Sequence, residues 1–386
     1  MPIGYLETVS SVALFTLAVL FPPRRPAVLA PVIQMVTHLV NEAPIIGWAW
    51  LVFATVTAAV DGELASTGGL LVAAFAALTA GGLVVVTVRG LRARATIENA
   101  FRLAHWPSGT APTMPSGKLQ IARRRLLARR LRSILLPLPV RPPSVRRVRN
   151  VSYGPHGRYN LADLYMTRDR LSEPTPVLIH LHGGHFDIGA KNREVRSLLY
   201  QFSQAGWLSI SANYRLRQAG SFPNSQIDVK RLIAWVRTSG TLYGADPKHI
   251  VVAGSSAGAH LTALAALTPN DPRFQPGFES ADTSIQGAVC LYGYFGEREH
   301  GPTPSTPLSY IRTDAPPFLI FGAGNDRLLP PKIAEKFVGL LSEVSKNPVL
   351  YARLPGAMHS FDLLPSPRFD AVIDAIERFA NQVRSR

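Results

Sequence analysis

Long apolar stretches dominate the first ninety residues of the chain. Three of them carry at most one charge: Gly4–Phe21, which contains Glu7 near its start, Pro44–Val60 and Gly68–Val88. About 20 apolar residues in a helix are enough to cross ~30 Å of hydrocarbon. The two tryptophans near one end of Pro44–Val60 are typical of an interfacial aromatic belt. The pattern therefore predicts a helical transmembrane region of about three spans.

A fourth apolar stretch, Ala27–Val40, is shorter and is interrupted by polar residues. We interpret it as an interfacial or re-entrant piece, with a fourth span as the alternative. A cleavable signal peptide would need a basic start and a site with small residues before the cut. The first stretch has neither feature before Pro22, so we expect it to remain as a span.

The segment that follows the apolar region changes character twice. Residues Ala104–Gly117 are rich in Pro, Ser, Gly and Thr without any periodicity, which predicts a loop. Residues Leu119–Leu136 place leucines and Ile134 near one face and arginines over much of the rest, which predicts a basic amphipathic helix. Such a helix lies on an anionic membrane surface or packs on the neighbouring domain, and both alternatives stay open. Four prolines between Pro137 and Pro143 end it.

From Val145 onward, short β-branched apolar runs alternate with helical patterns. This alternation predicts an α/β domain with a mostly parallel, eight-stranded sheet flanked by helices on both faces. The expected strands are Arg147–Tyr153, Ala162–Met166, Val177–His182, Leu208–Tyr214, Ile250–Ala253, Gly287–Tyr292, Phe318–Ala323 and Val349–Arg353. The expected helices are Asn192–Gln204, Asn224–Ser239, Ala257–Leu267, Lys332–Ser345 and Pro367–Arg384. The irregular section Tyr294–Pro316 follows a strand end, where a lid or substrate-pocket loop belongs.

These patterns divide the chain into three parts. We expect residues 1–90 to form the transmembrane helical region, residues 91–144 a basic linker with an amphipathic helix, and residues 145–386 the α/β domain. The slightly positive mean hydropathy of +0.11 agrees with membrane segments. The single cysteine, Cys290, excludes an intramolecular disulfide and a multi-cysteine metal site.

The net charge of +16 comes almost entirely from one segment. Between Arg89 and Asn150, fourteen arginines and Lys118 face one acid, Glu98, which leaves a local charge of +14. A basic stretch directly after an apolar span indicates membrane topology and contact with anionic lipids. With three spans and the N-terminus outside, every basic loop lies in the cytoplasm, so we expect a multi-pass inner-membrane protein with a cytoplasmic α/β domain. No nucleic-acid fold signature accompanies the charge, and we expect no nucleic-acid partner.

The candidate chemistry centres on Gly254-Ser-Ser-Ala-Gly258, a Gly-x-Ser-x-Gly sequence. A short apolar strand precedes it and an Ala- and Leu-rich helix follows, the context that a nucleophile turn requires. Ser256 is then the expected nucleophile, on a sharp strand-to-helix turn that flanking glycines permit. The N-terminus of the following helix offers backbone N–H groups, that of Ala257 first, to a developing oxyanion.

Three histidines lie close together in His180-Leu-His-Gly-Gly-His-Phe186, which follows an expected strand. Gly183 and Gly184 allow this loop to present backbone N–H groups, so we predict an oxyanion hole from Gly183, Gly184, His185 and Ala257. A metal site is the alternative, but no further ligand at a suitable spacing joins the histidines, so no metal is expected.

Two further residues complete the expected constellation. Asp326 follows the strand at Phe318, where a carboxylate can accept the N–H of a histidine and fix its tautomer. His359 lies in a loop after the last expected strand. The order Ser256, Asp326, His359 is the chain order of this strand–turn–helix architecture. Singly, Asp326 could be a turn residue and His359 a surface histidine; together they predict a catalytic triad.

The stretch from about Val145 to the C-terminus resembles the α/β-hydrolase superfamily, and within it carboxylesterases of the hormone-sensitive-lipase and kynurenine-formamidase-like branch. The resemblance rests on His182-Gly-Gly-His-Phe186, Gly254-Ser-Ser-Ala-Gly258, Gly322-Ala-Gly-Asn-Asp326 and Gly356-Ala-Met-His-Ser-Phe361. Two positions depart from the pattern: His185 replaces a third glycine of many relatives, and Ser255 replaces their aspartate. With the N-terminal spans, the chain is similar to membrane-anchored Lip-type esterases of mycobacteria.

The resemblance and the motifs together imply a membrane-anchored serine carboxylesterase or lipase that needs no cofactor. Its expected substrates are short- to medium-chain carboxylic esters, lipid esters included. An amidase, a formamidase or an acyltransferase would use the same triad, because only the bond cleaved or the final acceptor differs. A non-catalytic membrane scaffold is disfavoured because no triad or oxyanion element is lost.

Overall fold

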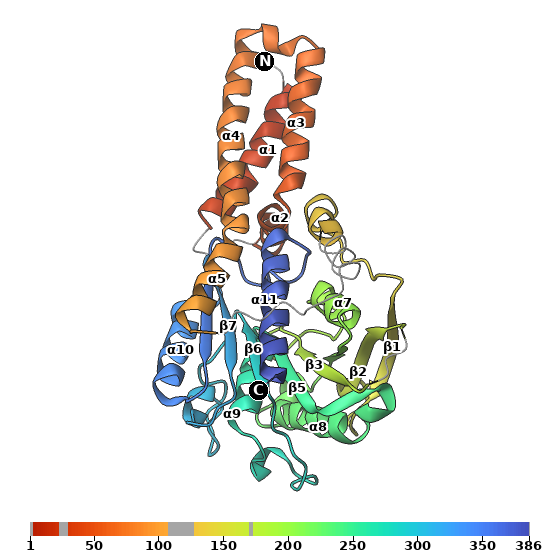
Figure 1. Cartoon of the computed structure of the whole chain (residues 1–386). Coiled ribbons are helices and arrows are strands. Elements are labelled where there is room, and N and C mark those ends of the chain that lie inside the picture. The colour runs from red at the N-terminus through yellow and green to blue at the C-terminus, as the bar shows by residue number, and fades with distance from the viewer. Residues whose placement is uncertain (1–2, 23–29, 107–126, 170–172, 386) are drawn as a thin grey trace.

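The computed structural model describes residues 3–22, 30–106, 127–169 and 173–385 of the chain. Three apolar helices form a stalk that stands on an α/β domain (Figure 1). The stalk consists of α1 (Ile3–Leu20), α3 (Pro44–Val60) and α4 (Thr67–Leu91). The start of α1 and the α3–α4 turn lie at its far end, and α4 leads back toward the domain.

The stalk helices bury one side against each other and expose apolar residues on the other. Val9, Leu51 and Leu83 are buried between them, whereas Leu71 and Leu78 are 68% and 76% exposed. Two helices, Ile3–Leu20 and Thr67–Leu103, are long and apolar enough to cross a membrane, and α2 with α3 would add a third if the bent pair forms one span. Exposed apolar surface of this kind is typical of helices that face lipid.

Helix α2 (Ala30–Glu42) turns sharply into α3, with an angle of 96° between residues 36–42 of α2 and α3. Pro44 occupies the first turn of α3, where the proline ring is tolerated but cannot continue the helix before it. This bend places α2 between the stalk and the domain, beside the start of the last helix (Figure 1). It covers most of the stretch that we interpreted as interfacial or re-entrant.

The α/β domain contains one eight-stranded sheet in the order β1-β2-β4-β3-β5-β6-β7-β8. Strands β3 to β8 are parallel, and β2 runs antiparallel to both of its neighbours. The predicted mostly parallel sheet is therefore confirmed. The strands are β1 (Val145–Ser152), β2 (Leu161–Thr167), β3 (Thr175–Leu181), β4 (Leu208–Ala212), β5 (Ala245–Ser255), β6 (Gly287–Leu291), β7 (Phe318–Ala323) and β8 (Val349–Leu354).

Helices cover both faces of the sheet. Each face packs against its own set of three helices, and each set contributes side chains to a separate apolar core. Parallel sheets need both faces covered because their strands are apolar on both sides. The first set is α5 (Ala93–Leu103), α7 (Arg196–Gln204) and α11 (Pro367–Arg384), and the second is α8 (Asn224–Thr238), α9 (Ala257–Leu267) and α10 (Lys332–Val344).

Helix α5 was not predicted, because its sequence lies in the segment that we assigned to the basic linker. Its buried side chains Ile97 and Phe101 pack in the same core as α11. Trp106, just after the helix, stacks on Phe379 at a centroid distance of 5.1 Å. The first part of the predicted linker therefore packs on the catalytic domain, while the domain boundaries themselves stay a prediction.

Only the end of the predicted amphipathic helix lies within the described residues, as a helix over 127–135. Its polar side contacts α11: Arg129 pairs with Asp374, and Ser133 donates to Asp370 at 2.6 Å. Leu127 and Leu135 on its other side are 60% and 67% exposed. This part of the helix packs on the domain by its polar side, and the predicted loop at residues 107–117 lies outside the described residues.

Candidate active site

Ser256 stands between β5 and α9 in a backbone conformation that L-residues rarely adopt, with φ 53° and ψ −113°. The flanking glycines make this turn sterically feasible. A Cβ at Gly254 would lie 2.2 Å from the carbonyl oxygen of Gly258, and a Cβ at Gly258 would lie 2.0 Å from that of Leu181. Strain at a non-glycine residue persists only where the surroundings fix it, which is typical of functional positions.

The structure brings the three predicted residues together from loops after three strands. His359 Nε2 lies 3.0 Å from Ser256 Oγ, and His359 Nδ1 lies 2.7 Å from Asp326 Oδ2. The other carboxylate oxygen of Asp326 accepts the backbone N–H groups of Leu328 and Leu329, each at 2.9 Å. The Asp326 side chain is 1% exposed and that of His359 is 10% exposed. The carboxylate is therefore held from both sides.

The loop predicted to complete the oxyanion hole needs one correction. Gly183 donates its N–H to Glu194 Oε2 at 2.8 Å, so that group is not available to an oxyanion. Gly183 instead allows close approach, because a Cβ there would lie 3.1 Å from Ser256 Cβ. Gly184 has φ +126°, and a Cβ would lie 1.9 Å from the Ile188 carbonyl oxygen. The candidate N–H donors narrow to those of Gly184, His185 and Ala257.

A cavity of about 460 Å³ opens beside Ser256. The predicted pocket loop, Tyr294–Pro316, contributes Tyr294 and three charged residues to its wall. The guanidinium of Arg298 lies 4.0 Å from the centre of the Phe186 ring, and it donates to Gly220 O at 2.7 Å. The cavity is lined by His185, Phe186, Asp187, Arg217, Ser256, Ala257, Tyr294, Glu297, Arg298, Glu299 and Leu329.

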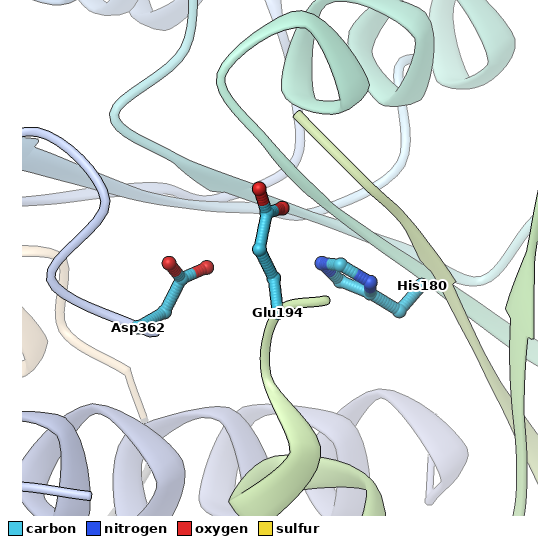
Figure 2. Close-up of side chains that lie close together, drawn as sticks. All are labelled: His180, Glu194 and Asp362. Atoms are coloured by element: carbon cyan, nitrogen blue, oxygen red, sulfur yellow. The ribbon is translucent and has the colours of Figure 1, made fainter. Parts of the chain in front are cut away.

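Behind the nucleophile turn lies a buried polar cluster formed by His180, Glu194 and Asp362. One ligand-type atom from each lies within 4.8 Å of the others, and Figure 2 shows Glu194 between the other two side chains. Asp362 Oδ2 accepts from Ser255 Oγ at 2.6 Å, and its Oδ1 accepts from Tyr292 Oη at 2.5 Å. Both oxygens of Asp362 therefore already accept hydrogen bonds, with which a metal ion would have to compete.

The cluster contacts residues that adjoin Ser256 and the glycine loop. Glu194 holds the Gly183 N–H, and Asp362 holds Ser255, the residue before the nucleophile. The hydroxyl of Tyr292 donates to Asp362, and the Tyr292 ring packs edge-on against His359 at a centroid distance of 4.6 Å. Sequence reasoning missed both acids, because neither stands in a recognised motif. The only available signal was that Asp362 follows the His359 loop directly.

Burial dominates the electrostatics of this cluster. Burial, with the charge of Asp362 second, raises the pKa of Glu194 from 4.5 to about 8, and burial also raises the pKa of Asp362. Burial lowers the pKa of His180 to about 3, so its imidazole is neutral. At neutral pH the two carboxyl groups therefore retain a proton, since two adjacent buried carboxylates repel each other.

This retained proton predicts a pH dependence of stability. Folded Glu194 keeps its proton between its ordinary pKa of 4.5 and about 8, whereas the unfolded chain releases it. Its stabilising contribution is fully present below 4.5 and is lost as the pH rises through about 8. We expect the melting temperature of Glu194→Gln to fall less than that of the wild type between about pH 5 and about pH 8. Equal slopes for the wild type, Glu194→Gln and the exposed-site control Glu343→Gln would contradict this assignment.

His182 also has structural partners. His182 Nδ1 lies 2.8 Å from the Gly183 carbonyl oxygen, and its ring stacks on Tyr214 at 4.4 Å. His180 Nε2 lies 3.0 Å from Ser255 Oγ. The two rings thus serve different contacts rather than converging on one ligand.

Comparisons with known proteins agree with this architecture. A family model described as BD-FAE matches residues 162–297. The chain is 35% identical over 302 residues to esterase LipQ of Mycobacterium tuberculosis, which covers 70% of each protein. It is 40% identical over 261 residues to "Probable carboxylic ester hydrolase LipM" of the same organism, covering 61% of each chain. It is 35% identical over 288 residues to esterase LipC, covering 65% of this chain and 71% of LipC.

Solved esterase structures share the fold. A truncated carbohydrate esterase from gut microbiota aligns with a TM-score of 0.55 at 18% identity, covering 62% of this chain and 97% of that one. Esterase Est2 of Thermogutta terrifontis with bound butyrate aligns with a TM-score of 0.53 at 20% identity, covering 62% of this chain and 95% of that one. Because its matches to LipQ and LipC extend over most of each protein, the chain belongs to the carboxylic ester hydrolases of the α/β-hydrolase fold that include these mycobacterial Lip esterases.

Proposed function

We propose that the protein is a membrane-anchored serine carboxylesterase whose triad is Ser256, Asp326 and His359. The observation that carries this proposal is the pair of hydrogen-bond distances that joins them, 3.0 Å between Ser256 Oγ and His359 Nε2 and 2.7 Å between His359 Nδ1 and Asp326 Oδ2. A nucleophile, a base and a group that orients the base, all within hydrogen-bond reach, are what covalent acyl transfer requires.

In the mechanism, Ser256 Oγ attacks the ester carbonyl while His359 Nε2 takes the hydroxyl proton. The carboxylate of Asp326 holds Nδ1–H and stabilises the imidazolium that forms. His359 then returns the proton to the leaving alcohol, and the acyl group stays on Ser256. A water molecule attacks this acyl-enzyme with His359 again as base, and the acid is released.

Backbone N–H groups are the proposed stabilisers of the tetrahedral oxyanion. Ala257 is the first residue of α9, so its N–H has no carbonyl earlier in the helix to bind. Across the pocket, the N–H groups of Gly184 and His185 are the second source. Donors fixed in this way need no reorganisation when charge develops. Such electrostatic stabilisation of the transition state is the largest single contribution to the rate in many enzymes.

The cavity supports small to medium substrates. A volume of about 460 Å³ is near the lower end of the ~300–1,000 Å³ range of small-molecule sites. Phe186 and Leu329 offer apolar surface, while Arg217 and Glu299 are among its charged residues. We propose short- to medium-chain carboxylic esters as substrates, including esters that partition into a membrane.

The first test combines a substrate series with active-site labelling. The full chain in detergent is assayed on p-nitrophenyl esters from acetate to palmitate, and a fluorophosphonate probe is mapped by mass spectrometry. We expect hydrolysis with an optimum among the shorter chains and a single labelled residue, Ser256. A label on another serine would refute the proposed nucleophile. Inertness on every ester would direct the search to formamides and acyl-transfer acceptors.

We further propose that α1, α3 and α4 span the inner membrane with the N-terminus outside. The acids Asp61 and Glu63 lie in the α3–α4 turn, at the end of the stalk far from the domain (Figure 1). Arg89, Arg92 and Arg94 lie at the opposite end, where α4 meets the domain. Positive charge concentrates on the cytoplasmic side of membrane proteins, so this distribution supports a cytoplasmic catalytic domain.

Topology is testable because Cys290 is the only cysteine and is completely buried. Ala65→Cys places a thiol in the α3–α4 turn, and Ser342→Cys places one on the exposed side of α10. In intact cells, a membrane-impermeant maleimide should label Ala65→Cys and not Ser342→Cys. After permeabilisation it should label both. Labelling of Ser342→Cys alone in intact cells would reverse the proposed orientation.

A further inference from the structure

The stalk contacts the two loops that carry Asp326 and His359. The side chain of Asn325, the residue before Asp326, donates to the carbonyl oxygen of Val19 at the end of α1, at 3.4 Å. The N–H of Asn325 donates to the Ala357 carbonyl oxygen at 2.8 Å, so the two loops also bind each other. The hydrogen bonds of Asn325 therefore connect α1 with both loops.

Helix α2 makes the closer contact. Asn41, in its last turn, is 4% exposed and donates from Nδ2 to the carbonyl oxygen of Gly356 at 3.1 Å. Gly356 has φ +65°, and a Cβ there would lie 3.0 Å from the side chain of Arg89 at the end of α4. This glycine is three residues before His359 and starts the turn that aims the imidazole at Ser256.

A buried ion pair fixes α2 at this place. Glu42 pairs with Arg368 of α11, and both residues are 1% exposed. The second Glu42 oxygen accepts from Ser366 Oγ at 2.9 Å, and Arg368 also donates to the Pro355 carbonyl oxygen at 3.3 Å. Since an unpaired buried charge is strongly destabilising, neither partner can leave without the other. The contact between α2 and the histidine loop, residues 355–361, is therefore a fixed interface.

We propose that Asn41 and Glu42 of α2 are positioning residues for His359, so that the membrane-proximal helix forms part of the support of the catalytic centre. Asn41 binds the Gly356 carbonyl group at the start of the loop that carries His359. Glu42 and Arg368 in turn bind Asn41 and the Pro355 carbonyl group and fix their positions. The hydrogen bond between Ser256 and His359 depends on this support, because Asn41 and Arg368 bind two consecutive carbonyl groups of the loop, those of Gly356 and Pro355, just upstream of the imidazole. This inference rests on the proposed role of His359 as the catalytic base.

The test compares Asn41→Ala and Asn41→Gln with the wild type in the full chain, in detergent and in membranes. Hydrolysis of p-nitrophenyl butyrate gives kcat per fluorophosphonate-labelled site, and KM. Because a small displacement of a catalytic group lowers the rate steeply, we expect kcat of Asn41→Ala to fall about 10- to 100-fold. KM should stay within about twofold, since Asn41 does not line the pocket. Asn41→Gln keeps the amide and should recover part of the rate.

The matched control is Thr55→Val, which removes the 3.1 Å contact with Tyr5 inside the stalk and touches neither catalytic loop. Its kcat should equal that of the wild type. Backbone hydrogen exchange of residues 354–361 provides a readout that does not need activity, and it should accelerate in Asn41→Ala while β5 stays protected. An unchanged kcat per labelled site, or unchanged exchange in this segment, would overturn the inference. An inert wild type with Asn41-dependent exchange would instead refute the proposed catalytic function and leave the support in place.

Discussion

Ser256→Ala should abolish ester hydrolysis, with a loss in kcat of roughly 10⁴-fold or more. The substitution removes only the oxygen that lies 3.0 Å from His359 Nε2. Without it no acyl-enzyme can form, and the residual rate comes from substrate binding and the oxyanion donors alone. The backbone strain at this position remains, because alanine adopts the same φ of 53° at a similar cost. The measurement is steady-state hydrolysis of p-nitrophenyl butyrate by matched amounts of purified protein.

Ser342→Ala, on the exposed side of α10, is the matched control and should retain full activity. If Ser256→Ala keeps more than about one hundredth of the wild-type rate, another nucleophile carries the reaction and the triad proposal is wrong.

Asp326→Asn should lower kcat by about 10³- to 10⁴-fold while leaving KM nearly unchanged. The N–H groups of Leu328 and Leu329 fix Oδ1 of this side chain as an acceptor. An asparagine would therefore keep its oxygen there and turn its NH₂ group toward His359 Nδ1. That contact favours the imidazole tautomer with the proton on Nε2, which cannot take a proton from Ser256.

The control for this charge removal is Asp314→Asn, since Asp314 is exposed, pairs with Arg312 and does not line the cavity. We expect its rate to match the wild type. A loss of less than about tenfold in Asp326→Asn would show that Asp326 does not set the tautomer, and a buried acid such as Asp362 would become the next candidate.

The sequence predicted the parts of the site whose chemistry depends on neighbours along the chain. Ser256 is recognisable because a strand, two glycines and a helix must adjoin it, and a mostly parallel sheet follows from alternating strands and helices. Gly183 was assigned a wrong N–H role because its acceptor, Glu194, is eleven residues away and the hydrogen bond depends on how β3 and α7 pack. Local patterns do not encode that geometry.

The buried pair of Glu194 and Asp362 is a second feature that local sequence patterns do not predict. Ser255 stands where many members of the resembled family have an aspartate, and in this chain its hydroxyl donates to the carboxylate of Asp362. An aspartate at position 255 would add a third carboxyl group to a site that already retains a proton. Helix α5 was missed for a related reason: its arginines suggested a solvated linker, whereas Ile97 and Phe101 bury its other side.

The packing of α5 also determines where a soluble fragment of this enzyme can begin. A fragment that starts at Val145 would leave uncovered the apolar surface of β8 and α11 on which Ile97, Phe101 and Trp106 lie. Exposed apolar patches of this kind drive self-association. Such a fragment should therefore form aggregates in size-exclusion chromatography. A fragment that starts at Arg92 retains α5 and keeps that surface covered, but it lacks α2, so Arg368 loses Glu42 as its ion-pair partner.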